Sequence, residues 1–475
     1  MYPFWEGLFI HSTLYVAFTS AFHVFVSHLT VAAAWFNLYL ERRAVKENRE
    51  EFYVYLKRSA LGLLVFAYVF GALAGVGIWQ TTTAANPRGI STLIHNFVFY
   101  WGSEWYMFLI DVLGIITYYY TLGRVSKETH LRLAWILALG ATGTLSIIVG
   151  ILSFKLTPGA WFETGLSLSG FFNPTFWPQI AMRFAFMFAI TAVWVLFIAG
   201  GLPANFHARN EIIRAGARFG LIGLAAGVLI WLLWFEPSLP VHAKAILPSR
   251  AIPQPTFPLI YLGLVVTFLV LLFALIAPSR QRQLFALGTM VFMYGAIFGA
   301  ERTREVLRKP DIIAGYMSSN QLLFNDIPAR GIQSEERWLS ERGMLGNLPF
   351  VPAMDKLAAT ASDVTFGIGD PEIAAGRVLA IQQCGSCHSV SHQTSMTIAG
   401  VRLDLRSQAG LLKMRNLTTA DKIDAYIRGI GGFPYMHPFV GTDAERRALA
   451  RYLEAFLHDT YPELAPQAQS QTSTR

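Results

Sequence analysis

Charged residues are scarce in this chain of 475 residues, where Asp, Glu, Lys and Arg together make up 14%. Soluble proteins carry roughly a quarter of such residues, and here 53% of all residues are hydrophobic. The composition therefore excludes an ordinary soluble protein and predicts a large membrane domain, in contact with lipid, plus a small polar domain. The formal net charge of +8 does not indicate a nucleic-acid partner, because much of the basic charge lies in loops between apolar stretches.

Cysteine is scarcer still, since Cys384 and Cys387 are the only two and none remains for a structural disulfide. They belong to the sequence Cys384-Gly-Ser-Cys387-His388, a C-x-x-C-H pattern typical of covalent haem c attachment. Both thiols would form thioethers with the haem, and His388 would bind its iron. The alternative, a redox dithiol or half of a zinc site, would leave the missing second cysteine pair unexplained.

No short apolar segment with a cleavage site marks a signal peptide, because the first apolar stretch runs from about Gly7 to Leu40. We expect it to be an uncleaved helix. Crossing a membrane takes roughly 20 apolar residues, which predicts an all-α fold built on a polytopic bundle of about eight transmembrane helices. The expected segments are 7–40, 58–80, 95–122, 131–154, 176–201, 213–235, 257–277 and 283–304.

Basic residues alternate between loops, and basic loops stay in the cytoplasm. This pattern predicts an outside N-terminus and, after eight crossings, an outside C-terminal domain in a bacterial cytoplasmic membrane. Attachment of haem c takes place on that outer side, so the two signals agree. The odd-numbered loops carry Arg42, Arg43, Lys46, Arg49, Lys57 and Arg58; then Arg124, Lys127 and Arg132; then Arg209, Arg214 and Arg218; then Arg280 and Arg282.

The expected domains are a transmembrane haem-binding domain at 1–308, an outer connector of unassigned fold at 309–368 and a monohaem cytochrome domain at 369–460. A disordered tail would occupy 461–475, which is rich in Gln, Ser, Thr and Pro.

Within the third domain, Met436 is the best candidate for the second iron ligand, because it precedes a helix that we expect to start near Thr442. Asp370 is a candidate N-cap, with Pro371 in the first turn. The rival ligands are Met396, Met414 and His437.

Ionisable residues within membrane segments are costly and usually functional. His23 lies mid-segment and would be a haem ligand or a hydrogen-bonded structural histidine. Glu301 and Arg304 would serve a haem or form a surface ion pair. Glu104 and Asp111 would handle protons or pack polar surfaces at a subunit contact. His11, His28 and Arg183 are the remaining such residues.

Two resemblances follow from these residues. The order of C-x-x-C-H motif, Met loop and final helix is similar to class I cytochromes c. Thr-Ser-Ala-Phe-His23, Gly71-Ala-Leu-Ala-Gly-Val-Gly77, Gly102-Ser-Glu104 with Asp111, and Gly299-Ala-Glu301-Arg-Thr-Arg304 resemble, in that order, subunit I of cytochrome bd-type oxidases. This resemblance implies high-spin haem b or d, two in all, near His23 and Glu301, with Arg304 at the propionates and a companion membrane subunit.

Three departures set the chain apart from quinol oxidases of that family. Met182 or Arg183 stands where the family has a low-spin haem histidine, only about 20 residues join the sixth and seventh segments, and the Gln-Pro-Trp after the late Arg is absent. We therefore expect a divergent, cytochrome c-linked terminal oxidoreductase that receives electrons from a redox protein and reduces oxygen. The alternatives are a haem-bearing anchor subunit that relays electrons in a larger complex and a channel regulated by a cytochrome.

Overall fold

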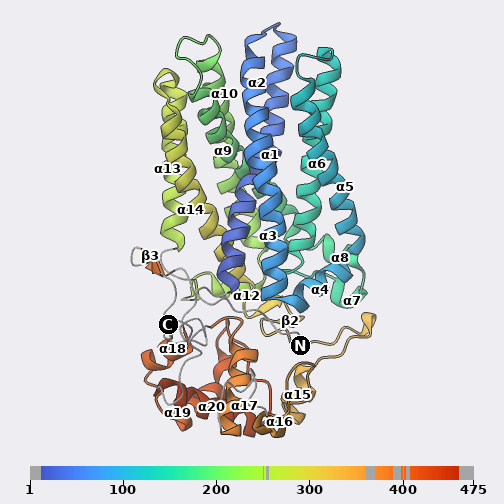
Figure 1. The fold of residues 1–475 in the computed structure, drawn as a ribbon, viewed down its shortest axis with the longest axis vertical. Helices are drawn as coiled ribbons and strands as arrows, with labels where there is room; N and C mark the ends of the chain where they lie inside the picture. The colour runs from blue at the N-terminus through green and yellow to red at the C-terminus, as the bar shows by residue number, and fades with distance from the viewer. Residues whose placement is uncertain are drawn as a thin grey trace, which may run out of the picture.

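A computed structural model describes residues 12–249, 251–252, 256–359, 370–388, 397–398, 401–402 and 407–458. An upright bundle of long helices forms one part of the molecule, and a smaller helical domain lies against one end of it (Figure 1). The candidate residues His11 and Met396, the end of the connector and the tail at 461–475 lie outside the described residues.

Seven helices in the described part of the chain are long and apolar enough to cross a membrane. They coincide with seven of the eight expected segments. Their apolar side chains suit the lipid interior, and the α-helix pairs every backbone N–H and C=O group within the segment. The eighth, α5, spans 24 residues and packs along α6, but many of its residues are aromatic or polar. The long segments are α1 (Ser12–Lys46), α2–η1–α3 (Glu51–Gly62, Leu63–Val69, Phe70–Ala85), α5 (Val98–Thr121), α6 (Lys127–Ser153), α9 (Phe176–Gly200), α10–η2–α11 (Arg209–Ile230, Trp231–Phe235, Glu236–Ser238), α13 (Thr256–Ile276) and α14 (Gln283–Leu307).

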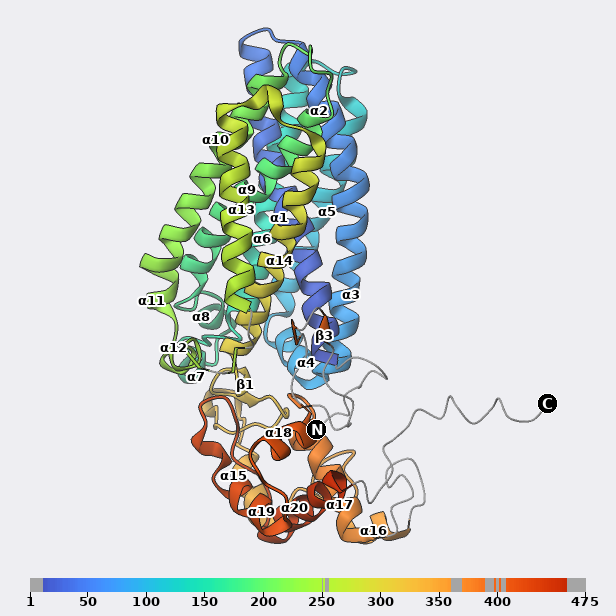
Figure 2. The same cartoon turned by 90° about the vertical axis from the view of Figure 1, so that its left-hand side faces the viewer.

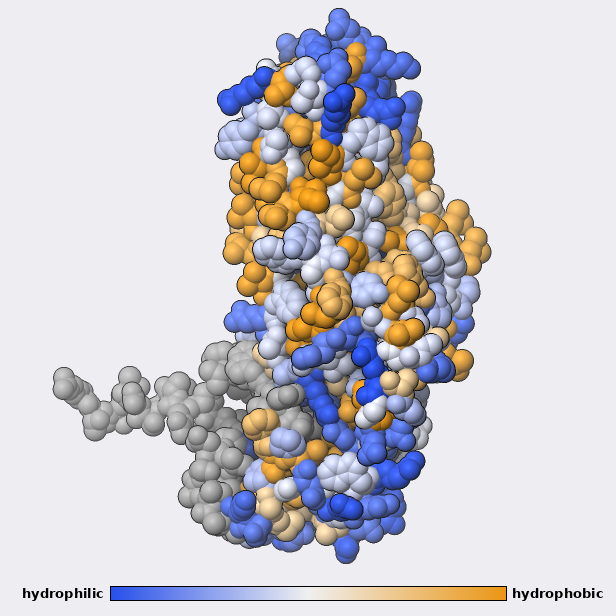
Figure 3. All heavy atoms as spheres, turned by 90° about the vertical axis from the view of Figure 1, so that its right-hand side faces the viewer, coloured by the Kyte–Doolittle hydropathy of each residue, from blue (hydrophilic) through white to orange (hydrophobic). Residues whose placement is uncertain are grey.

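The surface of the bundle carries a broad apolar belt between two polar ends (Figure 3). Large side chains such as Phe99, Val76 and Leu233 are exposed within the helices of this belt. Such an apolar area is far larger than soluble monomers expose, and it agrees with a multi-pass membrane protein.

The end of the bundle away from the small domain is held by ion pairs between loops. Arg43 and Arg49, after the first span, both contact Glu211 at the start of α10, at 2.6 and 3.1 Å. Basic loops therefore gather at this end, opposite the C-terminal domain (Figure 1), as the charge pattern predicts.

Short helices cover the other end of the bundle, next to the small domain (Figure 2). They are α4 (Pro87–Asn96), α7 (Trp161–Thr164), α8 (Ser167–Phe171) and α12 (Val241–Ile246). Among the described residues, only the short helices α11 and α12 lie between η2 and α13, so this connection is short, as expected from the sequence.

The connector, for which the sequence predicts no fold, is folded over its described residues, 309–359. It begins with a two-stranded antiparallel sheet and continues through a 3-10 turn and two short helices. Its elements are β1 (Asp311–Ile313), β2 (Met317–Ser318), η4 (Pro328–Arg330), α15 (Glu336–Arg342) and α16 (Met354–Ala359).

The C-terminal domain is built around the crossing of α17 and α20. Gly376 makes this crossing possible, because a Cβ there would lie 2.1 Å from the backbone oxygen of Ala448. Both predicted helix starts are confirmed: the Asp370 carboxylate accepts from two backbone N–H groups of α17, and Thr442 forms a capping box with Glu445. The elements are α17 (Pro371–Leu379), η5 (Ala380–Cys384), β3 (Thr397–Ile398), β4 (Val401–Arg402), α18 (Gln408–Met414), α19 (Ala420–Arg428), η6 (Ile430–Gly432) and α20 (Asp443–Leu457).

Candidate functional site: two possible haem sites

His23 of α1 faces the glycine-rich start of α3. Its Nδ1 lies 3.0 Å from the carbonyl oxygen of Gly71, and a Cβ at Gly75 would lie 3.3 Å from its ring. A carbonyl that accepts from Nδ1–H fixes the tautomer that leaves Nε2 as the acceptor nitrogen. Metal-binding histidines use this arrangement, so the surroundings of His23 fit an iron ligand. The same bond also fits a structural histidine.

Glu301 is the centre of a buried charge cluster near the outer end of α14. Its Oε1 accepts from Arg183 of α9 at 3.1 Å, and Arg304 Nη2 lies 2.5 Å from Oε2. The side chains of all three are at most 19% exposed. His28 joins the cluster, with Nε2 3.2 Å from Arg183 Nη1, and His23 is near enough to interact electrostatically with Glu301.

Positive charge exceeds negative charge in this cluster, because one carboxylate faces two guanidinium groups. Nε of Arg183 and Nε of Arg304 are buried without a hydrogen-bond partner. Buried charges and donors of this kind are expensive unless an anion compensates them. The residues therefore fit a group that brings carboxylates of its own, such as the propionates of a haem.

Glu104 and Asp111 lie on α5, on the other side of the second span. Asp111 is buried and accepts a hydrogen bond of 2.5 Å from the Tyr68 hydroxyl in η1. Glu104 is half-buried, one turn from Trp101, whose ring packs against Trp79 of α3. The structure brings neither acid into contact with His23 or Glu301. Proton transfer from Glu104 or Asp111 to the surroundings of His23 and Glu301 would therefore need intervening water.

The cytochrome motif and the Met436 loop line one cavity. Cys384, Cys387, His388 and Met436 line a cavity of about 140 Å³ that is open to solvent. Both cysteines are free thiols. Most of the remaining wall is apolar or aromatic: Leu411, Leu412, Leu417, Tyr426, Ile427, Ile430, Tyr435, Phe439, Leu449 and Leu453. A flat apolar macrocycle held by residues at its edge suits such a lining.

Hydrogen bonds between Gln383 and Val440 join the two parts of this cavity. The Gln383 amide donates to Val440 O at 2.6 Å and accepts from Val440 N at 3.0 Å. They tie the segment before Cys384 to the loop that carries Met436. Of the rival ligands, Met414 does not line the cavity and is exposed, whereas His437 lines it.

Lys309, which follows α14, contacts one of the cysteines that line this cavity. Its Nζ lies 3.0 Å from Cys387 Sγ and 3.2 Å from Ser319 Oγ. Burial raises the pKa of the Cys384 thiol to about 12. Burial also acts on Cys387, but the Lys309 ammonium outweighs it and holds the pKa of that thiol below its usual value. Cys387 is thus the more readily ionised of the two.

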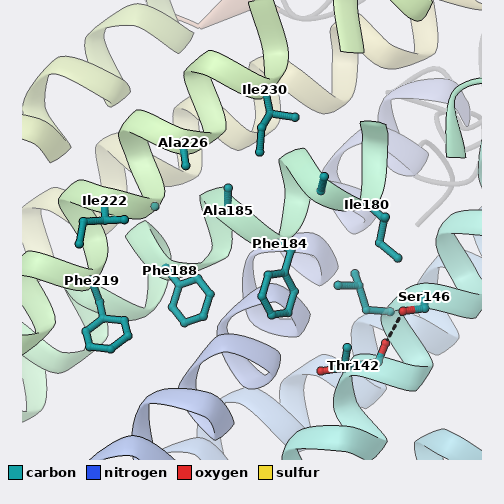
Figure 4. Close-up of a pocket in the computed structure, with 13 residues that line it drawn as sticks. Thr142, Ser146, Ile180, Phe184, Ala185, Phe188, Phe219, Ile222, Ala226 and Ile230 are labelled. Carbon is teal, nitrogen blue, oxygen red and sulfur yellow. Dashed lines mark hydrogen bonds between the residues drawn. The ribbon is translucent and has the colours of Figure 1, made fainter. Parts of the chain in front are cut away.

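A second cavity, lined almost wholly by apolar side chains, lies between α6, α9 and α10 (Figure 4). Phe184, Phe188 and Phe219 contribute to its wall. None of the residues predicted to be functional lines it. Among the described residues, no group of three or more His, Cys, Asp or Glu side chains could hold a metal ion.

Sequence reasoning missed three contacts. Arg183 stands out as an intramembrane charge, but its pairing with Glu301 joins helices far apart in the chain. Lys309 and Asp311 lie in a connector whose polar composition gives no signal of a site. Asp311 Oδ1 lies 3.0 Å from Nε2 of His437, the residue after Met436.

No protein-family model matches this chain, and no curated protein matches it. Among solved structures it is similar to the bd oxidase from Geobacillus thermodenitrificans, with a TM-score of 0.54 and 15% sequence identity. The match covers 69% of this chain and 91% of that one. At this identity the likeness concerns the fold, and the bundle therefore has the fold expected from the order of its sequence motifs.

Proposed function

We propose that this chain is a respiratory electron-transfer protein in which a cytochrome c domain serves a bd-like terminal oxidoreductase, with oxygen as the acceptor. One observation supports it above all: α14 carries Glu301, and Lys309 in the connector that follows lies 3.0 Å from Cys387 of the C-x-x-C-H motif. One chain thus joins an intramembrane site suited to haem with an outer site suited to haem c.

Each residue has a chemical task in this proposal. Cys384 and Cys387 attach the haem c, and His388 and Met436 hold its iron. His23 and Glu301 are the iron ligands for haem b or haem d in the membrane, while Arg183 and Arg304 neutralise propionates. The haems supply one-electron transfer and, where an axial position is open, oxygen binding. Glu104 and Asp111 transfer protons, which reduction of oxygen to water consumes in equal number with electrons.

The membrane setting is part of the same proposal. The small domain and the N-terminus lie outside the bacterial cytoplasmic membrane, and the basic loops at the opposite end lie inside. The exposed apolar side chains of the bundle contact lipid and a companion membrane subunit.

One observation favours the second candidate, a haem-bearing anchor that relays electrons without substrate chemistry. Glu301 has a guanidinium group within 3.1 Å of each oxygen, an arrangement that also suits a carboxylate whose task is to neutralise charge. Carbon monoxide separates the two functions. It should alter the spectrum of the reduced membrane haems in an oxidase and leave it unchanged in a relay with closed iron sites.

The electron donor decides the direction of flow, and we expect a redox protein, not a quinol. The connection between η2 and α13 has only about 20 residues, 236–255, and is too short for a large quinol-binding loop. In stopped-flow mixing, reduced soluble cytochrome c should reduce the c haem first and the membrane haems next. Rapid reduction of the membrane haems by a quinol, ahead of the c haem, would reverse the proposed direction.

Met436→Ala should lower the reduction potential of the c haem and open its sixth position, because a thioether ligand is lost. Redox titration and the far-red methionine-to-iron absorption measure both effects. Met414→Ala is the matched control, since Met414 does not line the cavity. His437→Ala tests the rival that does. If only this variant changed the spectrum, His437 would be the ligand.

A further inference from the structure

The connector contributes side chains to the apolar cores of both domains. Ile313 and Leu323 are buried in a cluster with Phe97 and Trp161 of the membrane domain. Leu322 is buried in the core of the C-terminal domain. Leu322 and Leu323 are adjacent in an extended stretch, where successive side chains point to opposite faces. The chain is thus wedged between the domains at this point.

Polar contacts secure the connector to the membrane domain. The guanidinium of Arg88, in α4, donates to both carboxylate oxygens of Glu335 at 2.7 and 2.9 Å. It also donates to the backbone oxygen of Gln321 at 2.8 Å. Arg330 of the connector donates to Asn96 Oδ1 at 2.7 Å. A bidentate, partly buried arginine pair holds geometry better than an exposed one.

Hydrogen bonds and an ion pair likewise secure the connector to the C-terminal domain. The buried Glu445 carboxylate, in α20, accepts from the backbone N–H groups of Met344 and Leu345 at 2.8 and 2.7 Å. Asp311 sits at ion-pair distance from His437, and its other oxygen accepts from Gly315 N at 2.8 Å. The His437 ring also packs edge-on against Phe324 of the connector.

We propose that residues 309–359 form a rigid dock that holds the C-x-x-C-H cavity in one fixed position at the outer end of α14, with Asp311 as a positioning residue for the Met436 loop. This inference rests on the proposed function for the identity of the two sites. Only eight residues separate Glu301 from Lys309, a rise of roughly 12 Å along a helix. The two sites therefore keep one short separation, and the C-terminal domain does not swing out as a tethered carrier.

Distance measurement between spin labels tests the dock in the full-length protein in lipid nanodiscs. Suitable sites are Val241→Cys in α12 and Arg428→Cys in α19, both well exposed, and thioether formation leaves no native thiol to label. We expect one narrow distance distribution, identical in the oxidised and reduced protein. A broad distribution, or one that changes with redox state, would overturn the dock.

The same label pair, with Cys384 and Cys387 replaced by serine, measures docking without covalent haem. A narrow distribution in this variant would show that the dock does not depend on haem c. Absence of haem c from the protein with both cysteines intact would contradict the proposed function and leave the dock standing. A haem-loaded protein with a broad distribution would do the opposite.

The positioning role of Asp311 has its own test. Asp311→Asn removes the charge beside His437 and should weaken the far-red methionine-to-iron absorption and shift the c-haem potential. Asp326→Asn is the matched control on the same connector, because Asp326 is exposed and accepts only from Ser334 N among described contacts. Equal spectra and potentials in both variants would show that Asp311 does not position the ligand loop.

Discussion

Replacement of Cys384 or Cys387 by alanine is expected to abolish normal covalent haem attachment, so that the haem-stained band on denaturing gels loses most of its intensity. Both Sγ atoms lie at one cavity together with His388 and Met436. Under the proposed function each thiol forms one thioether bond, and normal attachment needs both. A denaturing gel retains only haem that is covalently bound, so the stained band reports this change without any assumption about the membrane haems.

Ser386→Ala is the matched control, because Ser386 lies between the two cysteines and lines the same cavity but forms no bond to haem. It should keep the stained band. Protein immunoblots of the same gels separate loss of haem from loss of the chain. A stained band of unchanged intensity in both cysteine variants would remove the basis for the cytochrome assignment.

Local patterns in the sequence predict much of this structure. Apolar runs long enough to cross a membrane locate the spans, since a lipid-facing helix must be apolar along its whole length. The caps at Asp370 and Thr442 are equally local, because a side chain bonds backbone groups two or three residues away. The grouping of Cys384 with His388 follows from their spacing alone.

Contacts between distant segments are beyond such reasoning. Arg183 and Glu301 are 118 residues apart, and nothing in either neighbourhood specifies the other. The connector is polar, and its apolar residues follow no regular period. Its side chains enter the cores of both domains only because other parts of the chain supply the surfaces against which they pack. Sequence reasoning assigns Glu104 and Asp111 to proton handling or polar packing without naming a partner, and the structure shows Tyr68 as the partner of Asp111.

Within the membrane domain, we expect the largest change in stability and haem content from substitution of Glu301. Glu301→Ala would leave Arg183 buried without its carboxylate partner and Arg304 with only Glu305, at 3.9 Å, and an unpaired buried charge of this kind costs about 3–5 kcal/mol. We expect both a marked fall in thermal stability and the loss or disturbance of a membrane haem, with the c haem retained. Pigment analysis of the purified protein, giving b, c and d haem per chain, measures the second effect.

His23→Ala separates ligand loss from general destabilisation. His23 makes one hydrogen bond, to Gly71 O, and such a bond contributes about 1 kcal/mol. Its loss should barely change the melting temperature, yet a membrane haem should be lost or disturbed as in Glu301→Ala. His95→Ala is the control, because His95 is exposed on α4 and bonds only within its own helix. Normal b-type haem content and spectra in both His23→Ala and Glu301→Ala would exclude these residues as ligands and leave the Glu301 cluster a structural network of charges.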